Sequence, residues 1–177
     1  MIYYAGIGSR ETPLEILNVF DDLGYFFAEK GFILRSGGAI GADQSFEKGC
    51  DRKNGKKEIY LPWMGFENSD STLIVKNLKA FEIAKKFHPY WHNLSQGAQK
   101  LQARNSHQIL GRDLNTPCQF IVCWTRNGKG NGGTGQAIRI AKHYEIPIFD
   151  AGGYDDIKKF KSDLYKFLKE NYISASN

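Results

Sequence analysis

The chain has 177 residues, three cysteines and a formal net charge of +5 at pH 7. This length favours one domain over 1–177, and an apolar share of 41% is sufficient for a hydrophobic core. No apolar run is long enough to span a membrane, and the first residues lack the basic segment of a secretory signal. We therefore expect a cytoplasmic protein without a membrane partner, whose thiols stay reduced.

The spacing of apolar residues predicts strands and helices that alternate along the chain. Apolar runs predict strands at 2–6, 32–35, 58–62, 117–124 and 146–149. Helical spacing predicts helices at 13–30, 42–52, 71–87, 95–111, 134–144 and 155–172, before a frayed tail at 174–177. Thr12 is the expected cap of the first helix, and Pro13 is expected in its first turn.

The strands are apolar throughout, which is typical of parallel strands that are covered on both faces. The expected fold class is therefore α/β, a Rossmann-like three-layer fold with a mainly parallel sheet and helices on both faces. The segment at about 63–113 is expected to be a helical insertion, and its first part, 63–93, is expected to cover one edge of the ligand pocket.

Glycine-rich turns follow three of the predicted strands, at 6–10, at 36–43 and at 132–136. Ligands of parallel sheets bind beyond the carboxyl ends of the strands, and the first N–H groups of a helix can hold an anion. These turns therefore predict a shared site for a phosphate. The expected ligand-binding residues are Gly8, Ser9, Arg10, Ser36, Gly37, Gly38, Ala39, Asp43, Arg104, Asn105, Thr125, Gly132, Gly133, Thr134, Gly135 and Gln136.

Asp43 and Arg104 are the candidate catalytic residues. Asp43 opens the second predicted helix, where it either caps that helix or accepts a ribose hydroxyl or a proton. Asn105 falls on the apolar face of its helix, so its amide needs partners, which a ligand pocket would supply. Arg10 suits a phosphate or pairs with Glu11 or Asp43 on the surface, and Arg35 stands where an arginine would accept a 2′-phosphate. The histidine spacing indicates no metal site, and no cofactor is expected.

The motifs Gly6-Ile7-Gly8-Ser9-Arg10, Ser36 to Asp43, Ala103-Arg104-Asn105 and Gly132 to Ala137 form an ordered set. Over about residues 1–150 this set resembles the Rossmann-like core of the DprA/Smf family. More broadly it resembles the SLOG superfamily, which includes the LOG phosphoribohydrolases and short stand-alone phage proteins. The resemblance implies a Rossmannoid fold and a pocket for nucleotide-like or phosphoribosyl ligands, including ADP-ribose-type signals.

The favoured hypothesis is a binding protein for an ADP-ribose-like or signalling nucleotide. LOG enzymes carry glutamates on the helix after the glycine run, where this chain has Ile138 and Arg139. A nucleotide N-glycosidase of the phosphoribohydrolase type, with Asp43 or Asp113 as base, remains an alternative. A third hypothesis is binding of single-stranded DNA, because Trp63, Phe66, Tyr90 and Trp91 are candidate stacking residues in a basic chain. A homo-oligomer is compatible with each of these functions.

Overall fold

A computed structural model describes residues 1–174, which form a six-stranded parallel sheet of order β4-β3-β2-β1-β5-β6. The strands are β1 (Tyr3–Gly6), β2 (Ile33–Ser36), β3 (Lys57–Leu61), β4 (Leu73–Ile74), β5 (Phe120–Cys123) and β6 (Ile148–Asp150). The predicted α/β fold class is confirmed. Residues 175–177 of the predicted tail lie outside the described residues.

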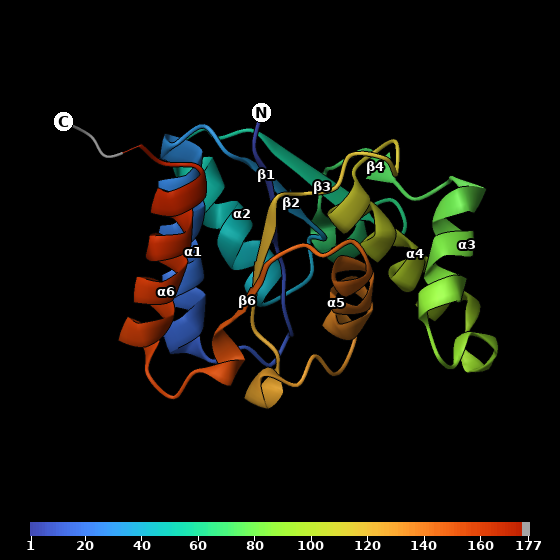
Figure 1. Cartoon of the computed structure of the whole chain (residues 1–177). Coiled ribbons are helices and arrows are strands. Elements are labelled where there is room, and N and C mark those ends of the chain that lie inside the picture. The colour runs from blue at the N-terminus through green and yellow to red at the C-terminus, as the bar shows by residue number, and fades with distance from the viewer. Residues whose placement is uncertain (175–177) are drawn as a thin grey trace.

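Helices cover both faces of this sheet (Figure 1). One layer consists of α1 (Leu14–Glu29), α2 (Ala42–Arg52) and α6 (Ile157–Asn171). The other consists of α3 (Leu78–Phe87), α4 (Gln96–Leu110) and α5 (Thr134–His143). Short 3-10 turns lie at η1 (Phe66–Asn68), η2 (Trp91–Asn93), η3 (Arg126–Gly128) and η4 (Ala151–Gly153). None of the described helices has the length and apolar character that crossing a bilayer requires.

The two faces of the sheet have different cores. Below α1, α2 and α6 the core is aromatic, and Phe120 lies at its centre with the rings of Tyr4, Phe27 and Phe32 within 6.1 Å. Below α3, α4 and α5 the core consists mainly of aliphatic residues such as Ile121. Because both faces are covered, the strands are apolar throughout, as the sequence pattern predicted.

Two local predictions are wrong. The helix predicted at 71–87 begins only at Leu78, because residues 73–74 pair with β3 as a short edge strand. Ser71, just before this strand, also contacts β3, since its hydroxyl donates to Ile59 O. Thr12 does not cap α1: its hydroxyl donates to Ser9 O, and Pro13 is the N-cap residue in an extended conformation.

Strand order reverses at β1, which lies between β2 and β5. The chain leaves β3 near one edge of the sheet and returns at β5, and this connection contains β4, α3 and α4. The predicted insertion at 63–113 lies within the same connection. At such a switch point the loops after neighbouring strands diverge and leave a crevice at the carboxyl edge.

Candidate functional site

A pocket of about 490 Å³ lies at this switch point. It is bordered by the turns after β1 and β2, by one face of α4 and by the loop before α5. Its lining residues are Ile7, Gly8, Ser9, Arg10, Glu11, Ala39, Asp43, Phe66, Leu101, Gln102, Arg104, Asn105, Gln108, Asn131, Gly132, Gly133 and Thr134. The structure thus brings together ten predicted residues: Gly8, Ser9, Arg10, Ala39, Asp43, Arg104, Asn105, Gly132, Gly133 and Thr134.

Six other predicted residues do not line this pocket: Ser36, Gly37, Gly38, Thr125, Gly135 and Gln136. The Ser36 hydroxyl donates to Gly6 O, and Thr125 donates its hydroxyl and its N–H to Asp150. Gln136 is buried, and its amide donates to Ala84 O. These side chains hold the loops and helices that shape the pocket.

The Asp43 carboxylate joins the turns after β1 and β2. Its Oδ1 accepts from Gly8 N–H at 3.2 Å, and its Oδ2 accepts from Ala39 N–H at 3.3 Å. A carboxylate therefore takes the backbone donors that the sequence pattern assigned to a phosphate. Asp43 is not the N-cap of α2, because Gly41 has that position. Burial raises the pKa of Asp43 to about 6, although the Arg104 charge and the backbone donors oppose this rise.

Arg104 projects from α4 and is buried. Its Nη1 donates to Gly37 O and to Tyr60 O, and its Nε donates to Asn105 Oδ1. Among residues 1–174 its Nη2 has no hydrogen-bond acceptor. Burial lowers the pKa of Arg104 to about 10, so the guanidinium stays charged at neutral pH. The pocket therefore contains a fixed cation with a donor to spare.

Gly37 lets this guanidinium approach the backbone closely. A Cβ at Gly37 would collide with the Arg104 guanidinium and with the Gln108 amide. Any larger residue would push Arg104 out of its place, so Gly37 contributes to the site although it does not line the pocket.

Asn105 connects Arg104 to the loop before α5. Its Oδ1 accepts from Arg104 Nε at 2.9 Å, and its Nδ2 donates to Gly133 O at 3.0 Å. The prediction that this amide would need partners on a largely apolar helix face agrees with these contacts. The partners are protein groups, and they set the guanidinium beside the glycine loop.

The loop before α5 presents four consecutive backbone N–H groups, from Asn131 to Thr134. None of them donates to an acceptor within residues 1–174. Gly132 has a φ of 76°, and a Cβ added to Gly132 or Gly133 would meet no heavy atom within 4 Å. The backbone is therefore open to a ligand at the N-terminus of a 10-residue helix, where the helix dipole favours an anion.

Sequence reasoning did not assign Gln108 and Phe66 to the pocket. Gln108 is 3% exposed, lines the pocket and forms no side-chain hydrogen bond within the described chain. Its place on α4 follows the helical spacing from Leu101 through Arg104, so the pattern that located Asn105 also pointed to Gln108. Phe66 lies in the loop after β3, and hydrophobic periodicity does not predict where the side chains of a loop point.

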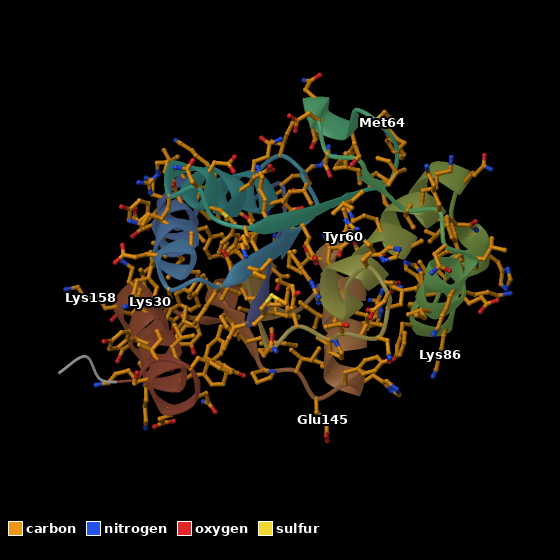
Figure 2. All side chains as sticks on the ribbon, turned by 90° about the horizontal axis from the view of Figure 1, so that it is seen from above. Lys30, Tyr60, Met64, Lys86, Glu145 and Lys158 are labelled. Atoms are coloured by element: carbon orange, nitrogen blue, oxygen red, sulfur yellow. The ribbon has the colours of Figure 1, made fainter. Side chains whose placement is uncertain are left out.

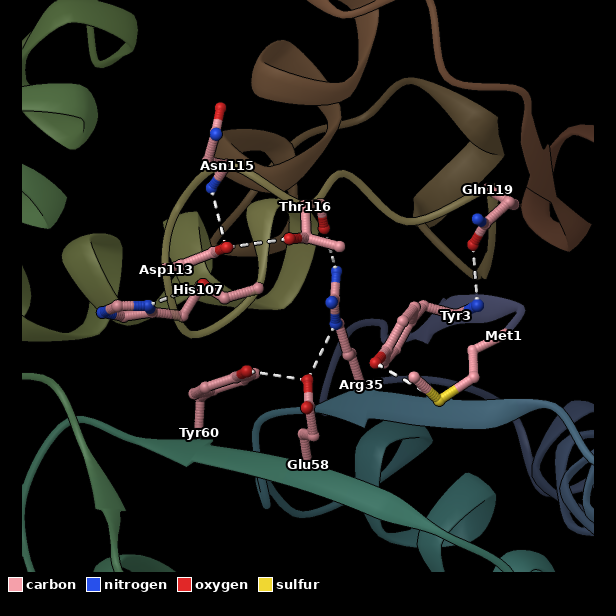
Figure 3. Close-up of polar contacts among 11 residues, drawn as sticks. Met1, Tyr3, Arg35, Glu58, Tyr60, His107, Asp113, Asn115, Thr116 and Gln119 are labelled. Atoms are coloured by element: carbon pink, nitrogen blue, oxygen red, sulfur yellow. Dashed lines mark hydrogen bonds and ion pairs between the residues drawn. The ribbon is translucent and has the colours of Figure 1, made fainter.

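Two sequence-based interpretations are wrong (Figure 3). Arg35 is 2% exposed, donates to Glu58 and to Thr116 O, and is therefore not available for a 2′-phosphate. Asp113, the alternative base, lies in the loop that leads into β5 and accepts from the Asn115 N–H and the Thr116 hydroxyl. It belongs to the amino end of the strand, away from the pocket.

The four aromatic residues proposed to stack on DNA differ in exposure. Phe66 is buried, and Trp91 packs partly against the aliphatic core. Trp63 and Tyr90 are exposed. The stacking surface that the third hypothesis needs is thus reduced to two separate side chains.

The sequence matches no protein-family model and no curated protein. Its fold is similar to a solved structure, the Moco carrier protein of Chlamydomonas rheinhardtii, with a TM-score of 0.54. The fold is Rossmann-like. Sequence identity is 18%, and the alignment covers 94% of this chain and 85% of the carrier protein. At this identity the similarity concerns the fold alone, and the resemblance to the SLOG superfamily rests on the sequence motifs.

Proposed function

We propose that the pocket binds a small phosphate-containing molecule derived from a nucleotide, with ADP-ribose as the representative ligand. The observation that carries this proposal is that two sets of hydrogen-bond donors suited to an anion line the same pocket. Arg104 has a spare donor, four N–H groups of the 131–134 loop have no acceptor within residues 1–174, and Asn105 joins the two. We also propose that the chain is a stand-alone DprA-like member of the SLOG superfamily, and a pocket for phosphate-containing ligands agrees with that assignment.

In this proposal a phosphate group lies between Arg104 and the N-terminus of α5, where charge-assisted hydrogen bonds would contribute about 1.5–3 kcal/mol each. In the same proposal Arg10, an exposed residue at the mouth of the pocket, receives a second phosphate. The buried polar groups of Asp43 and Gln108 suit sugar hydroxyls, and Ile7 with other apolar lining residues offers a surface to the sugar or base. The structurally similar Moco carrier protein is named for carrying a small molecule, which is in line with this role.

Calorimetry with ADP-ribose, AMP and adenosine tests the proposal. We expect AMP and ADP-ribose to bind and adenosine to bind at least tenfold more weakly, because 1.4 kcal/mol corresponds to a factor of about ten. Arg104→Ala should weaken binding about tenfold or more. Arg112→Ala is the matched control, since Arg112 is an exposed arginine that does not line the pocket. Equal affinities for AMP and adenosine would contradict the proposal.

The environment of Asp43 favours one alternative, cleavage of the N-glycosidic bond. A buried carboxyl with a pKa of about 6 lines the pocket beside Arg104, which suits proton transfer near neutral pH. The helix position that resembles the LOG acid holds Arg139, whose guanidinium donates to Phe87 O and to Gln136 Oε1. We therefore propose binding with little or no turnover. Rapid base release that Asp43→Asn abolishes would make the protein an enzyme.

A further inference from the structure

The loop at 63–69, between β3 and β4, contributes Phe66 to the lining of the pocket. Figure 2 shows Met64 on this loop, projecting at the outer edge of the molecule. The backbone hydrogen bonds within the loop are short-range: Phe66 N–H donates to Trp63 O at 3.3 Å, Asn68 N–H to Gly65 O and Ser69 N–H to Phe66 O, the last two at 3.0 Å. The loop therefore depends on side chains for its attachment to the pocket.

The backbone of this loop has an unfavourable conformation. Gly65, Glu67 and Asn68 have φ angles of 76°, 48° and 61°. Left-handed angles are ordinary for glycine and tolerated by asparagine, but they are costly for glutamate. A residue persists in such a conformation only where surrounding contacts compensate for it.

Two neighbouring side chains supply these contacts. Phe66 is 4% exposed, its ring lies 5.5 Å from the Arg104 guanidinium carbon, and Trp63 packs edge-on against it. Glu67 Oε1 pairs with Arg10 Nη2 at 3.0 Å, which links the loop to the turn after β1. The acid that pairs with Arg10 is therefore Glu67, and neither Glu11 nor Asp43, the two partners that the sequence suggested.

We propose that Glu67 is a specificity-determining residue, which occupies Arg10 until a second anionic group of the ligand displaces it. This inference rests on the proposed function. A ligand with one phosphate binds between Arg104 and the α5 N-terminus and leaves the Arg10–Glu67 pair in place. A diphosphate ligand reaches Arg10 at the mouth and must replace the Glu67 carboxylate there. Glu67 thereby lowers the advantage of diphosphates, and its displacement removes one of the two attachments of the loop.

Binding of AMP and ADP-ribose to wild type, Glu67→Gln, Arg10→Ala and the double variant tests this inference. Glu67→Gln should tighten ADP-ribose binding about two- to fivefold, the range expected for an exposed ion pair, and should change AMP binding less. In the Arg10→Ala background the same substitution should have no effect. A Glu67→Gln effect that persists without Arg10 would overturn the inference, because it would report general charge repulsion.

Glu11→Gln is the matched control, because it removes the same charge at the same rim. Glu11 pairs with Arg126 at 2.6 Å and does not contact the loop by an ion pair. It should tighten ADP-ribose binding less than Glu67→Gln does. An equal effect of the two substitutions would also overturn the inference.

Hydrogen exchange of the Asn68 and Ser69 amides in ligand-free protein provides a readout that does not depend on binding. Glu67→Gln and Arg10→Ala should speed this exchange, whereas Glu11→Gln should leave it unchanged. Unchanged exchange in Glu67→Gln overturns the inference, whether or not ligands bind. Faster exchange in Glu67→Gln, together with equal binding of AMP and adenosine, instead refutes the proposed function and leaves the loop attachment established.

Discussion

The pocket holds two buried residues of opposite charge, Asp43 and Arg104, that do not form an ion pair within residues 1–174. Burial is the largest influence on both, raising the pKa of Asp43 and lowering that of Arg104, and each charge partly offsets the shift of the other. Each residue is held by backbone partners from distant loops. Because backbone N–H groups already bind the Asp43 carboxylate, the Arg104 charge is available to attract an anion.

We expect the carboxyl of Asp43 to titrate with a pKa of about 6, which burial raises from the ordinary aspartate pKa of 3.8. A folded-state pKa that is raised stabilises the protein below the unfolded pKa of about 4, and this stabilisation is lost as the pH rises through 6. The loss amounts to roughly 3 kcal/mol, at 1.36 kcal/mol per pKa unit. Carbon NMR of the aspartate carboxyls should show one midpoint near 6 that is absent in Asp43→Asn. Midpoints below about 5 for every aspartate would contradict this assignment.

At the scale of elements, the N-terminus of α5 is the part of the pocket where we propose that backbone N–H groups bind the ligand. We expect Gly133→Val to abolish binding of AMP while the protein stays folded. Its side chain would enter open space above the free N–H groups, because a Cβ there meets no atom within 4 Å. Gly133 already has helical dihedral angles, so the substitution adds no left-handed strain. Calorimetry and the thermal midpoint measure the two effects.

Thr134→Val is the companion variant for this loop. It keeps the backbone donors and the side-chain volume and removes only a hydroxyl. Binding should change far less than in Gly133→Val. A greater loss in Thr134→Val would show that the hydroxyl, rather than the loop backbone, carries the interaction.

The crossing of α1 and α2 depends on glycines, because these helices approach each other closely. A Cβ at Gly49 would collide with Asp21 O, and one at Gly24 with Phe46 O. Gly49→Ala should therefore destabilise the protein by about 1–3 kcal/mol, the usual cost of overpacking. Urea unfolding measures this loss. Gly97→Ala in α4 is the control: its nearest neighbour would be a Trp63 ring carbon at 3.9 Å, so the alanine should be neutral or stabilising.

At the scale of the whole molecule, the sheet separates an aromatic core from an aliphatic one. Phe120 of β5 connects α1 and α6 through the aromatic cluster, with Phe27 and Phe167 both within 5.8 Å. Phe120→Ala should cost about 3–5 kcal/mol of unfolding free energy in urea, as for other buried phenylalanines. Tyr165→Ala, on the exposed side of α6, should stay within about 0.5 kcal/mol. A loss below 1 kcal/mol for Phe120→Ala would contradict the central place of this ring.

Sequence by itself determined the order of the main strands and helices, the parallel sheet and the position of the glycine-rich turns. These features follow from hydrophobic periodicity and turn chemistry, which operate over a few neighbouring residues. The short strand β4 was not predicted, because two residues are too few to show a hydrophobic period. It is a strand only because its residues pair with β3.

Only the tertiary structure decided the partners of the charged side chains. Asp43 binds the turn 35 residues before it, Glu67 binds Arg10 across 57 residues, and Arg35 is held inside the fold by Glu58 and Thr116. For the buried Asp43 and Arg35, the physical reason is that burial makes an unpaired charge costly, so packing selects whichever partner lies within reach, at any separation along the chain. The glycine-rich turns in the sequence predicted the edge of the sheet at which the pocket lies. The folded chain decided that Asp43 would accept from the N–H groups of Gly8 and Ala39, and that the N–H groups of the loop before α5 would have no acceptor within residues 1–174.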